Sequence, residues 1–248
     1  TLGKLGGRSV AFLARHGIGH IFPPSKVPYR ANIYALKSLG IKRIVSVSAC
    51  GSLRESYAPG HIVIPNQVFD FTHQRERSFF DTGLVAHVSV ADPFCESLST
   101  ILEESLIKLD ATYHRGGTYI TIEGPRFSTK GESGQYRQWG MDIIGMTASP
   151  EVFLAREAEM CYTTMAHVTD YDVWHVSEET VTVDMVVRTL QKNVKLAQDA
   201  IKLIVAHIDP SESCECENSL QNAIISNPSA ISKEKRQQLD LLVAKYLD

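Results

Sequence analysis

The sequence predicts a single α/β domain in which helices flank a largely parallel or mixed β-sheet. Apolar runs of strand length alternate with helix-like periodicity along most of the 248 residues, and this alternation is typical of that fold class. A chain of this length can bury roughly 70–75% of the surface that it exposes when unfolded, so one domain is sufficient. No apolar run approaches the roughly 20 residues that a membrane-spanning helix needs.

The first half of the chain alternates between the two kinds of element. A strand over 9–14 precedes a helix whose apolar residues recur at helical spacing from Tyr29 to Leu39. Gly40 can end that helix in the left-handed conformation, and a strand follows directly from residue 41. The pair Asp92-Pro93 is a suitable N-cap and first turn for the next helix, which leads to a strand over 117–122.

The second half repeats the pattern. Thr129 and Glu132 have the spacing of a capping box, so a helix should begin there, and Ser149-Pro150-Glu151 is interpreted as a similar start. Strands are expected over 141–144 and 161–169. The longest helix should begin near Thr182, because apolar residues from Val183 onward keep a 4,3,4,3 spacing and predict one buried face that includes Val187.

The organisation beyond these elements is simple. Residues 1–208 should form the domain, and 209–248 a polar segment that ends in a short, loosely attached amphipathic helix. The formal net charge of −3, with both signs interspersed, excludes the field that would attract nucleic acid or an anionic membrane. The opening Thr1-Leu2-Gly3-Lys4 does not begin a signal peptide, so the cytoplasm is the expected compartment.

The most informative segment is the apolar run that starts at Cys161 and ends in Asp170 and Asp172. In open α/β sheets, ligand crevices form at the carboxyl ends of strands. Two other strands end in the segments 48–52 and 145–147, which carry hydroxyls and a methionine. We therefore expect three strand ends to meet at one rim that suits a ligand with anionic, apolar and polar parts.

Any phosphate must bind without a glycine-rich nucleotide loop. Neither G-x-G-x-x-G nor G-x-x-x-x-G-K-S/T occurs in the chain. Arg15, His16 and His20 could form an oxyanion site together with the hydroxyl of Ser48 or Thr147. The alternative is an arginine paired to a carboxylate and two surface histidines.

Six motifs occur in a characteristic order along the chain. They are Arg15-His16-Gly17, Pro24-Ser25-Lys26-Val27, Ser48-Ala49-Cys50-Gly51-Ser52, Glu123-Gly124-Pro125-Arg126-Phe127-Ser128, Gly145-Met146-Thr147 and Thr169-Asp170-Tyr171-Asp172. With these motifs the chain resembles the S-methyl-5′-thioadenosine phosphorylases, of the trimeric purine nucleoside phosphorylases, from about residue 2 to about residue 208. The resemblance implies one nucleoside phosphorylase domain with a mixed, barrel-like central sheet. The implied reaction converts methylthioadenosine and phosphate to adenine and methylthioribose 1-phosphate.

The resemblance also implies roles for individual residues. Asp170 would carry or share a proton with the purine N7, and Asp172 would accept a hydrogen bond from the 6-amino group. No organic cofactor and no metal are implied, and inorganic phosphate is a co-substrate. The remaining residues fall into three groups: phosphate binding by Arg15, His16, Ser48, Ala49 and Thr147; purine and ribose binding by Phe127, Ser128 and Met146; and a 5′-methylthio pocket of Val183, Val186 and Val187, with His87 from a neighbouring subunit.

Three other functions share this pattern. Relatives that cleave inosine and guanosine typically carry Asn where Asp170 stands, and Glu where Ser128 stands, so both positions favour a 6-amino purine. A purine nucleoside phosphorylase acting on adenosine or inosine remains an alternative. A hydrolytic nucleosidase and a non-catalytic purine-binding subunit are two more.

The resemblance implies an assembly and a longer native chain. A homotrimer or a dimer of trimers is expected, and the adjacent Phe79 and Phe80 in a polar loop are interpreted as an interface core. The family's first strand and its Gly-Gly-Ser/Thr-Gly phosphate loop would lie before residue 1, so the N-terminal strand is missing from this sequence.

Cys214-Glu215-Cys216 is the one unusual cysteine motif. Some archaeal relatives carry a similar Cys-x-Cys, which implies a disulfide between Cys214 and Cys216, and two free thiols are the alternative. No further metal ligand can be named from the sequence, so no metal site is expected.

Overall fold

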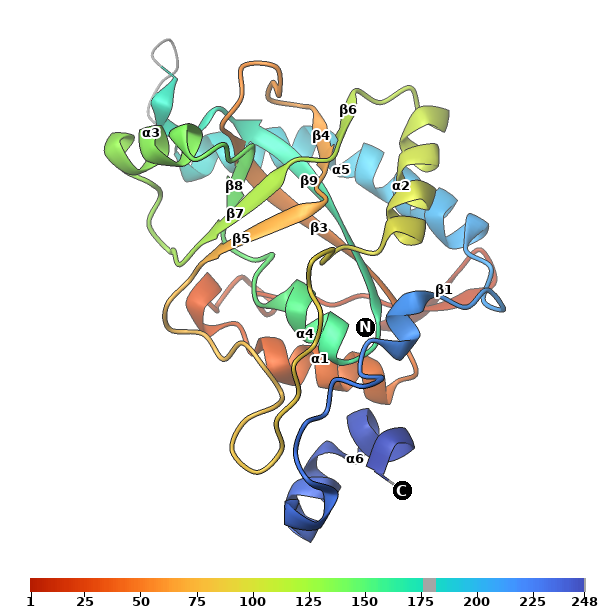
Figure 1. Cartoon of the computed structure of the whole chain (residues 1–248). Coiled ribbons are helices and arrows are strands. Elements are labelled where there is room, and N and C mark those ends of the chain that lie inside the picture. The colour runs from red at the N-terminus through yellow and green to blue at the C-terminus, as the bar shows by residue number, and fades with distance from the viewer. Residues whose placement is uncertain (176–181, 248) are drawn as a thin grey trace.

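The computed structural model describes residues 1–175 and 182–247, and its core is a seven-stranded mixed sheet (Figure 1). The strand order is β5-β7-β8-β3-β9-β4-β6, and a separate hairpin pairs β1 with β2. In the described residues β5 and β6 are the two edges, so the sheet does not close into a barrel. The strands are β1 Leu2–Leu5, β2 Arg8–Ala11, β3 Arg43–Ser52, β4 Ile62–Ile64, β5 Gln67–Phe71, β6 Tyr113–Arg115, β7 Thr118–Ile122, β8 Ile143–Gly145 and β9 Cys161–Asp170.

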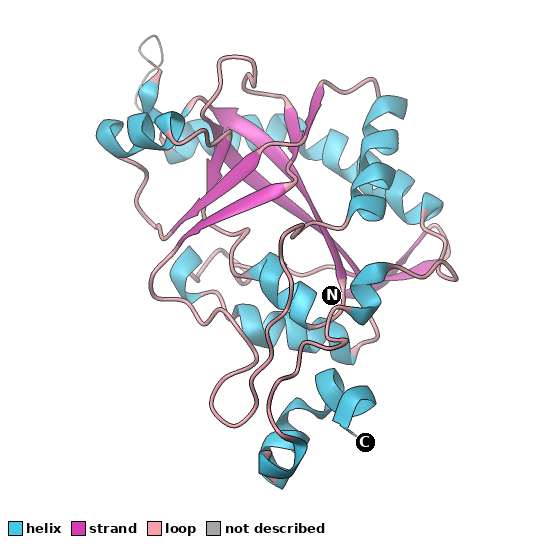
Figure 2. Ribbon diagram, viewed as in Figure 1, coloured by secondary structure: helices cyan, strands magenta, loops and turns pink. Residues whose placement is uncertain are grey.

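Helices cover both faces of the sheet (Figure 2). On one face α2 and α5 pack against β9, and their apolar residues form a cluster with Val45, Val47 and Met165 of the central strands. On the other face α1 and α4 pack together over Ile44 and Tyr162. The helices are α1 Tyr29–Ser38, α2 Glu96–Lys108, α3 Lys130–Gln138, α4 Glu151–Glu157, α5 Val183–His207 and α6 Lys233–Leu247, with short 3-10 turns η1 Pro24–Lys26, η2 Asp172–Trp174, η3 Glu215–Asn218 and η4 Pro228–Ala230.

The central pair of strands, β3 and β9, is parallel and ten residues long on each side. All ten residues of β9 are buried, which explains why its sequence is a continuous apolar run and does not alternate. The register opposes Ser48 to Ala166, and it shifts by one residue between Cys50 and Gly51 so that Gly51 opposes Asp170. The strand pair therefore brings the two sequence motifs around Ser48 and Asp170 side by side.

The other edge of β3 is largely open. Only Gly51 and Ser52 pair with β8, and no strand of the described residues pairs with that edge between Arg43 and Cys50. A cavity of about 910 Å³ lies along this edge, lined by Ser46 and Val47 of β3, Ile204 of α5, and by Arg15 and Glu151.

Several sequence predictions are confirmed element by element. The helix over 29–39, the strands over 117–122 and 161–169, and the long helix near Thr182 all occur within a few residues of the predicted bounds. The capping box is complete, since the Thr129 side chain accepts from the backbone of Glu132 and the Glu132 side chain accepts from the backbone of Thr129. Gly40 adopts a φ of 73°, as expected for a helix end.

Other predictions about local structure are wrong. The helix predicted from Asp92 begins only at Glu96, after Cys95, because the Asp92 carbonyl accepts a hydrogen bond from Arg156 and the chain there runs as a loop. The Ser149 hydroxyl does not cap α4, whose N-cap is Pro150. The predicted strand over 9–14 is shorter and belongs to the β1–β2 hairpin, outside the central sheet.

The prediction of three strand ends at one rim is wrong in its geometry. β8 runs antiparallel to β3, so the chain that leaves β8 turns back along β3 toward Ser48. Met146 and Thr147 therefore approach the segment 48–51 from the side, through an antiparallel register that sequence periodicity cannot reveal.

Three apolar features are buried or exposed contrary to expectation. Phe79 and Phe80 are buried in the core of this same chain, so their interpretation as an interface core is wrong. The C-terminal helix α6 is firmly packed, because Leu239, Leu242 and Val243 join that core. Val183 and Val187, in contrast, are 67% and 43% exposed, since the first turns of α5 extend beyond the sheet. Among the described helices, none combines the length and the apolar composition needed to cross a membrane.

Candidate active site

Two buried carboxylates form the centre of the site. Asp170 ends β9, and Asp172 follows in the turn η2, and their residues are 6% and 5% exposed. The Asp172 backbone N–H donates to Asp170 Oδ1 at 2.8 Å, and the Thr169 hydroxyl donates to Asp170 Oδ2 at 2.7 Å. The Ser133 hydroxyl of α3 donates to Asp172 Oδ2. Hydroxyl and amide donors thus fix both carboxylates in place.

Burial makes both carboxyl groups weaker acids. It raises the pKa of Asp170 above its ordinary range, although hydrogen bonds from Thr169 and the Asp172 amide oppose the shift. Burial also raises the pKa of Asp172 to about 6, and the nearby charge of Asp170 adds to the shift. A pair of carboxyl groups held in this way can keep a proton near neutral pH and share it with a ligand.

Glycine is required at position 51 by the close approach of this pair. A Cβ built on Gly51 would lie 3.0 Å from Asp170 Oδ1 and 3.3 Å from the Asp172 Cβ. The motif Cys50-Gly51-Ser52 therefore gives the two carboxylates space beside β3. Ser52 continues this role, because its carbonyl accepts a hydrogen bond from the Trp174 indole at 2.7 Å and holds the turn η2.

A buried arginine that the sequence analysis missed organises the loops around the carboxylates. The Arg75 side chain is 1% exposed and donates to the carbonyl of Glu123 at 2.8 Å and to that of Met146 at 2.7 Å. It also donates to the carbonyl of Ser149 at 2.6 Å and to the Tyr29 hydroxyl at 3.3 Å. One guanidinium thus ties together the loops that follow β7 and β8 and the start of α1.

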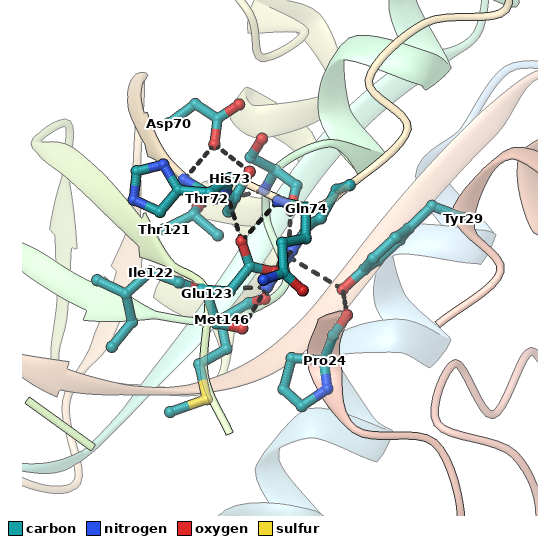
Figure 3. A network of polar contacts seen from close by, with 12 residues as sticks. Pro24, Tyr29, Asp70, Thr72, His73, Gln74, Thr121, Ile122, Glu123 and Met146 are labelled. Carbon is teal, nitrogen blue, oxygen red and sulfur yellow. Dashed lines mark hydrogen bonds and ion pairs between the residues drawn. The ribbon is translucent and has the colours of Figure 1, made fainter. Parts of the chain in front are cut away.

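Glu123, which follows β7, connects Arg75 to the backbone of the loop after β5. The Glu123 carboxylate pairs with Arg75. It also accepts hydrogen bonds from the backbone N–H groups of His73 and Gln74, as the close view in Figure 3 shows. Arg75 follows β5 in the charged run 72–77, which resembles a solvated turn in the sequence. In the sequence, only Glu123, the carboxylate that opens the motif 123–128, could have indicated that Arg75 has a buried partner.

Phe127, Ser128 and Met146, which the resemblance implies at the purine and ribose, lie in the loops that follow β7 and β8. The loop with half-buried Phe127 and buried Ser128 leads into α3, whose Ser133 contacts Asp172. Met146 packs against the cluster that contains Trp174. A Cβ on Gly124, where φ is 64°, would lie 2.6 Å from the Met146 sulfur, so glycine lets the two loops meet.

Arg15 reaches the face of β3 that carries the serines. Its Nε donates to Glu151 Oε2 at 2.8 Å, and its Nη2 donates to Ser46 Oγ at 2.6 Å. Burial alone would lower the pKa of Arg15, but the charge of Glu151 and its hydrogen bonds raise it well above the ordinary value. Arg15 is therefore a permanent cation. Ser48 lies two residues after Ser46 and shares its face of the strand.

His16 extends this basic end of the cavity. Its Nδ1 lies 2.8 Å from the Phe22 carbonyl, and its ring stacks on His20 with centroids 4.1 Å apart. Burial lowers the pKa of His16, and the neighbouring His20 and Arg15 oppose a further positive charge. Arg15 is thus paired to a carboxylate, as one of the two predicted alternatives has it, and it also lines the cavity together with His16 and His20.

Several buried hydroxyls of the described residues lack a hydrogen-bond partner. The Ser128 and Thr164 hydroxyls make no hydrogen bond within the described part of the chain. The Ser48 hydroxyl lies beside the Tyr119 hydroxyl without a well-aligned hydrogen bond. A buried hydroxyl without a partner costs roughly 1–3 kcal/mol, so this set is suited to a polar ligand.

The predicted methylthio pocket is not assembled within this chain. His87 is exposed in the loop before α2, where its backbone N–H donates to the Ala223 carbonyl at 2.9 Å. Val183 and Val187 are exposed at the start of α5, and Val186 is partly buried there. All five cysteines of the chain are free thiols, including Cys214 and Cys216.

Comparison with known proteins agrees with this architecture. The profile of the phosphorylase superfamily matches residues 1–206. The chain belongs to this superfamily. S-methyl-5′-thioadenosine phosphorylases of Geobacter sulfurreducens and Chloroflexus aurantiacus are each 49% identical to it over 246 residues, which is 99% of this chain and 86% and 85% of the relatives. The chain is thus a member of the S-methyl-5′-thioadenosine phosphorylase family.

Solved structures of that family share the fold. A methylthioadenosine phosphorylase from an antarctic soil metagenomic library superposes with a TM-score of 0.92 and 48% identity, covering 97% of this chain and 85% of that one. The methylthioadenosine phosphorylase of Schistosoma mansoni, solved with adenine, superposes with a TM-score of 0.85 and 36% identity over 96% of this chain and 87% of that one.

The raised pKa of Asp172 predicts a pH-dependent difference in stability. Because the folded-state pKa of about 6 exceeds the ordinary 3.8, the folded protein binds this proton more tightly than the unfolded chain does. Ionisation therefore destabilises the fold as pH rises through this window. Relative to wild type, Asp172→Asn should gain roughly 1–3 kcal/mol in free energy of unfolding between about pH 4.5 and about pH 7.5.

Urea unfolding of both proteins across this pH range measures the difference. Asp92→Asn provides the control, because it makes the same substitution at an exposed position. A constant offset of Asp172→Asn from wild type would show that Asp172 does not titrate in this window.

Proposed function

We propose that this protein catalyses phosphorolysis of S-methyl-5′-thioadenosine to adenine and methylthioribose 1-phosphate. The observation that carries the proposal is the buried pair Asp170 and Asp172, whose raised pKa values suit a carboxyl group that protonates a purine. The family membership and the adenine bound in the Schistosoma mansoni relative support the same substrate class.

The two carboxyl groups would act on the leaving purine. Cleavage of the N-glycosidic bond leaves negative charge on the departing base, so a proton held at N7 lowers the barrier. In our proposal Asp170 holds or shares that proton. Asp172 accepts a hydrogen bond from the 6-amino group, and Phe127, Ser128 and Met146 line the purine and ribose.

The phosphate would bind at the other end of the site. The cationic Arg15 and the hydroxyl of Ser48 share one face of β3, and His16 lies next to Arg15 in sequence and along the same cavity. We propose that these groups, the Ala49 backbone N–H and the Thr147 hydroxyl hold phosphate below the anomeric carbon. Positive charge that develops on the sugar is then stabilised by the phosphate itself, with no organic cofactor required.

An assay of activity on methylthioadenosine at several phosphate concentrations tests the proposal. Release of the purine base should depend on phosphate, should be faster for methylthioadenosine than for adenosine, and should be slowest for inosine, whose base is hypoxanthine. Equal adenine release with and without phosphate would contradict phosphorolysis and favour a hydrolytic nucleosidase. Purine binding without any release would favour a non-catalytic subunit.

Replacing Asp170 by Asn removes the acidic proton and keeps the shape of the side chain. Asp170→Asn should slow adenine release from methylthioadenosine on the order of 10²-fold, because the amide cannot protonate N7. The same variant should gain activity on inosine, whose O6 an amide can donate to. The exposed Asp92→Asn variant should match wild type on both substrates. Wild-type rates for Asp170→Asn on methylthioadenosine, with no gain on inosine, would refute the assignment.

Replacing Arg15 tests the phosphate end separately. Arg15→Lys keeps the positive charge beside Glu151 but replaces the two donor nitrogens of the guanidinium, Nε and Nη2, with one. The KM for phosphate should therefore rise about tenfold, as expected for loss of a charge-assisted hydrogen bond. The KM for methylthioadenosine should change little. Arg115→Lys, which alters an ion pair with the exposed Glu96 away from the cavity, is the matched control. If only the KM for methylthioadenosine rose, Arg15 would act at the nucleoside end of the site, and its assignment to phosphate would be wrong.

We also propose a cyclic homo-oligomer, most simply a trimer. The exposed Val183 and Val187 and the exposed His87 support this proposal, since a neighbouring subunit would complete the methylthio pocket from them. Light scattering of the purified protein measures the assembly, and a fully active monomer would exclude a shared pocket.

A further inference from the structure

Four cysteines that are far apart in the sequence meet at one point in the fold. The sulfur atoms of Cys95, Cys161, Cys214 and Cys216 all lie within 4.8 Å of one another. Cys95 precedes α2, Cys161 opens β9, and the other two flank the start of η3. Three of the four residues are buried, and Cys214 is partly buried. We propose that this cluster is a structural tetrathiolate site for Zn²⁺.

The spacing of the sulfur atoms fits a tetrahedral ion. Zinc–sulfur bonds of about 2.3 Å place the sulfurs of a tetrahedral site about 3.8 Å apart. The Cys95 and Cys214 sulfurs are 3.5 Å apart. A disulfide needs about 2.05 Å between its sulfurs, and all four residues are free thiols. Four sulfur ligands and a closed coordination shell are characteristic of structural zinc.

Polar groups around the cluster complement its charge. Four thiolates and one Zn²⁺ carry a net charge of −2, so nearby donors should stabilise the site. Arg156 Nη1 donates to the Cys216 sulfur at 3.2 Å, and the Ser97 hydroxyl lies 3.2 Å from the Cys95 sulfur and 3.6 Å from the Cys214 sulfur. The Arg156 side chain also holds the Asp92 carbonyl, so one cation links the cluster to the loop before α2.

The position of the cluster indicates a structural role. Cys161 and Asp170 lie at opposite ends of β9, which puts roughly 30 Å of extended strand between the cluster and the carboxylates. The metal would join α2, β9 and the segment after α5, which reaches the core through Cys216 and Leu220. It would thus fasten the C-terminal part of the chain to the sheet. The sequence expectation of no metal arose because Cys95 and Cys161 lie too far from Cys214 in the chain to be recognised as co-ligands.

Metal analysis of the protein tests this site. Protein purified with reductant and without chelator, from cells supplied with zinc, should contain about one zinc per chain. Cobalt substitution should produce the intense visible absorption of a tetrahedral thiolate complex. Cys214→Ser, at the partly exposed ligand, should lose the zinc and unfold at a lower temperature. Cys50→Ser, which changes the one cysteine outside the cluster, should keep the zinc.

Thiol counting distinguishes the alternatives. After denaturation with a chelator and no reductant, all five cysteines should react with an alkylating agent. Zinc-free protein with fewer than five reactive thiols would overturn the proposal in favour of disulfides within the cluster. Zinc-free protein with five reactive thiols, after growth in zinc, would overturn it in favour of a simple thiol cluster.

Discussion

The buried guanidinium of Arg75 is the interaction on which the shape of the site depends. It reaches the carbonyl groups that end β7 and follow β8, and it is nearly inaccessible to water. A charge buried to this extent is tolerated only when its donors are all engaged, and removing one partner typically costs 3–5 kcal/mol. The guanidinium of Arg75 therefore holds together the loops that carry Ser128 and Met146 and fixes their positions relative to each other.

A second ion pair, between Arg15 and Glu151, fixes the segment beside β3 in a similar way. Glu151 accepts both Arg15 and the Tyr162 hydroxyl, so the start of α4 is fixed against the sheet and against the arginine. The two pairs leave the carboxylates of Asp170 and Asp172 without a cationic partner among the contacts described. This separation of charges leaves the pKa values of both aspartates raised, while Arg15 remains positive.

The sequence predicted the parts of the site that depend on local patterns. The continuous apolar run that ends in Asp170, the capping box at Thr129 and the long helix from residue 183 are each determined by residues close together in the chain. The direction of β8, the burial of Arg75 and the meeting of Cys95 with Cys214 depend on contacts between distant segments. Local periodicity carries no information on such contacts, and a charged run such as 72–77 has the same pattern whether it is buried or solvated.

Product analysis with isotopically labelled phosphate tests the central claim, that this arrangement performs phosphorolysis, most directly. The protein is incubated with methylthioadenosine and phosphate labelled in its oxygens, and the sugar product is identified by mass spectrometry. Phosphorolysis predicts methylthioribose 1-phosphate that carries the labelled phosphate, formed in equal amount to adenine. Free methylthioribose as the product, with the label remaining in inorganic phosphate, would contradict it.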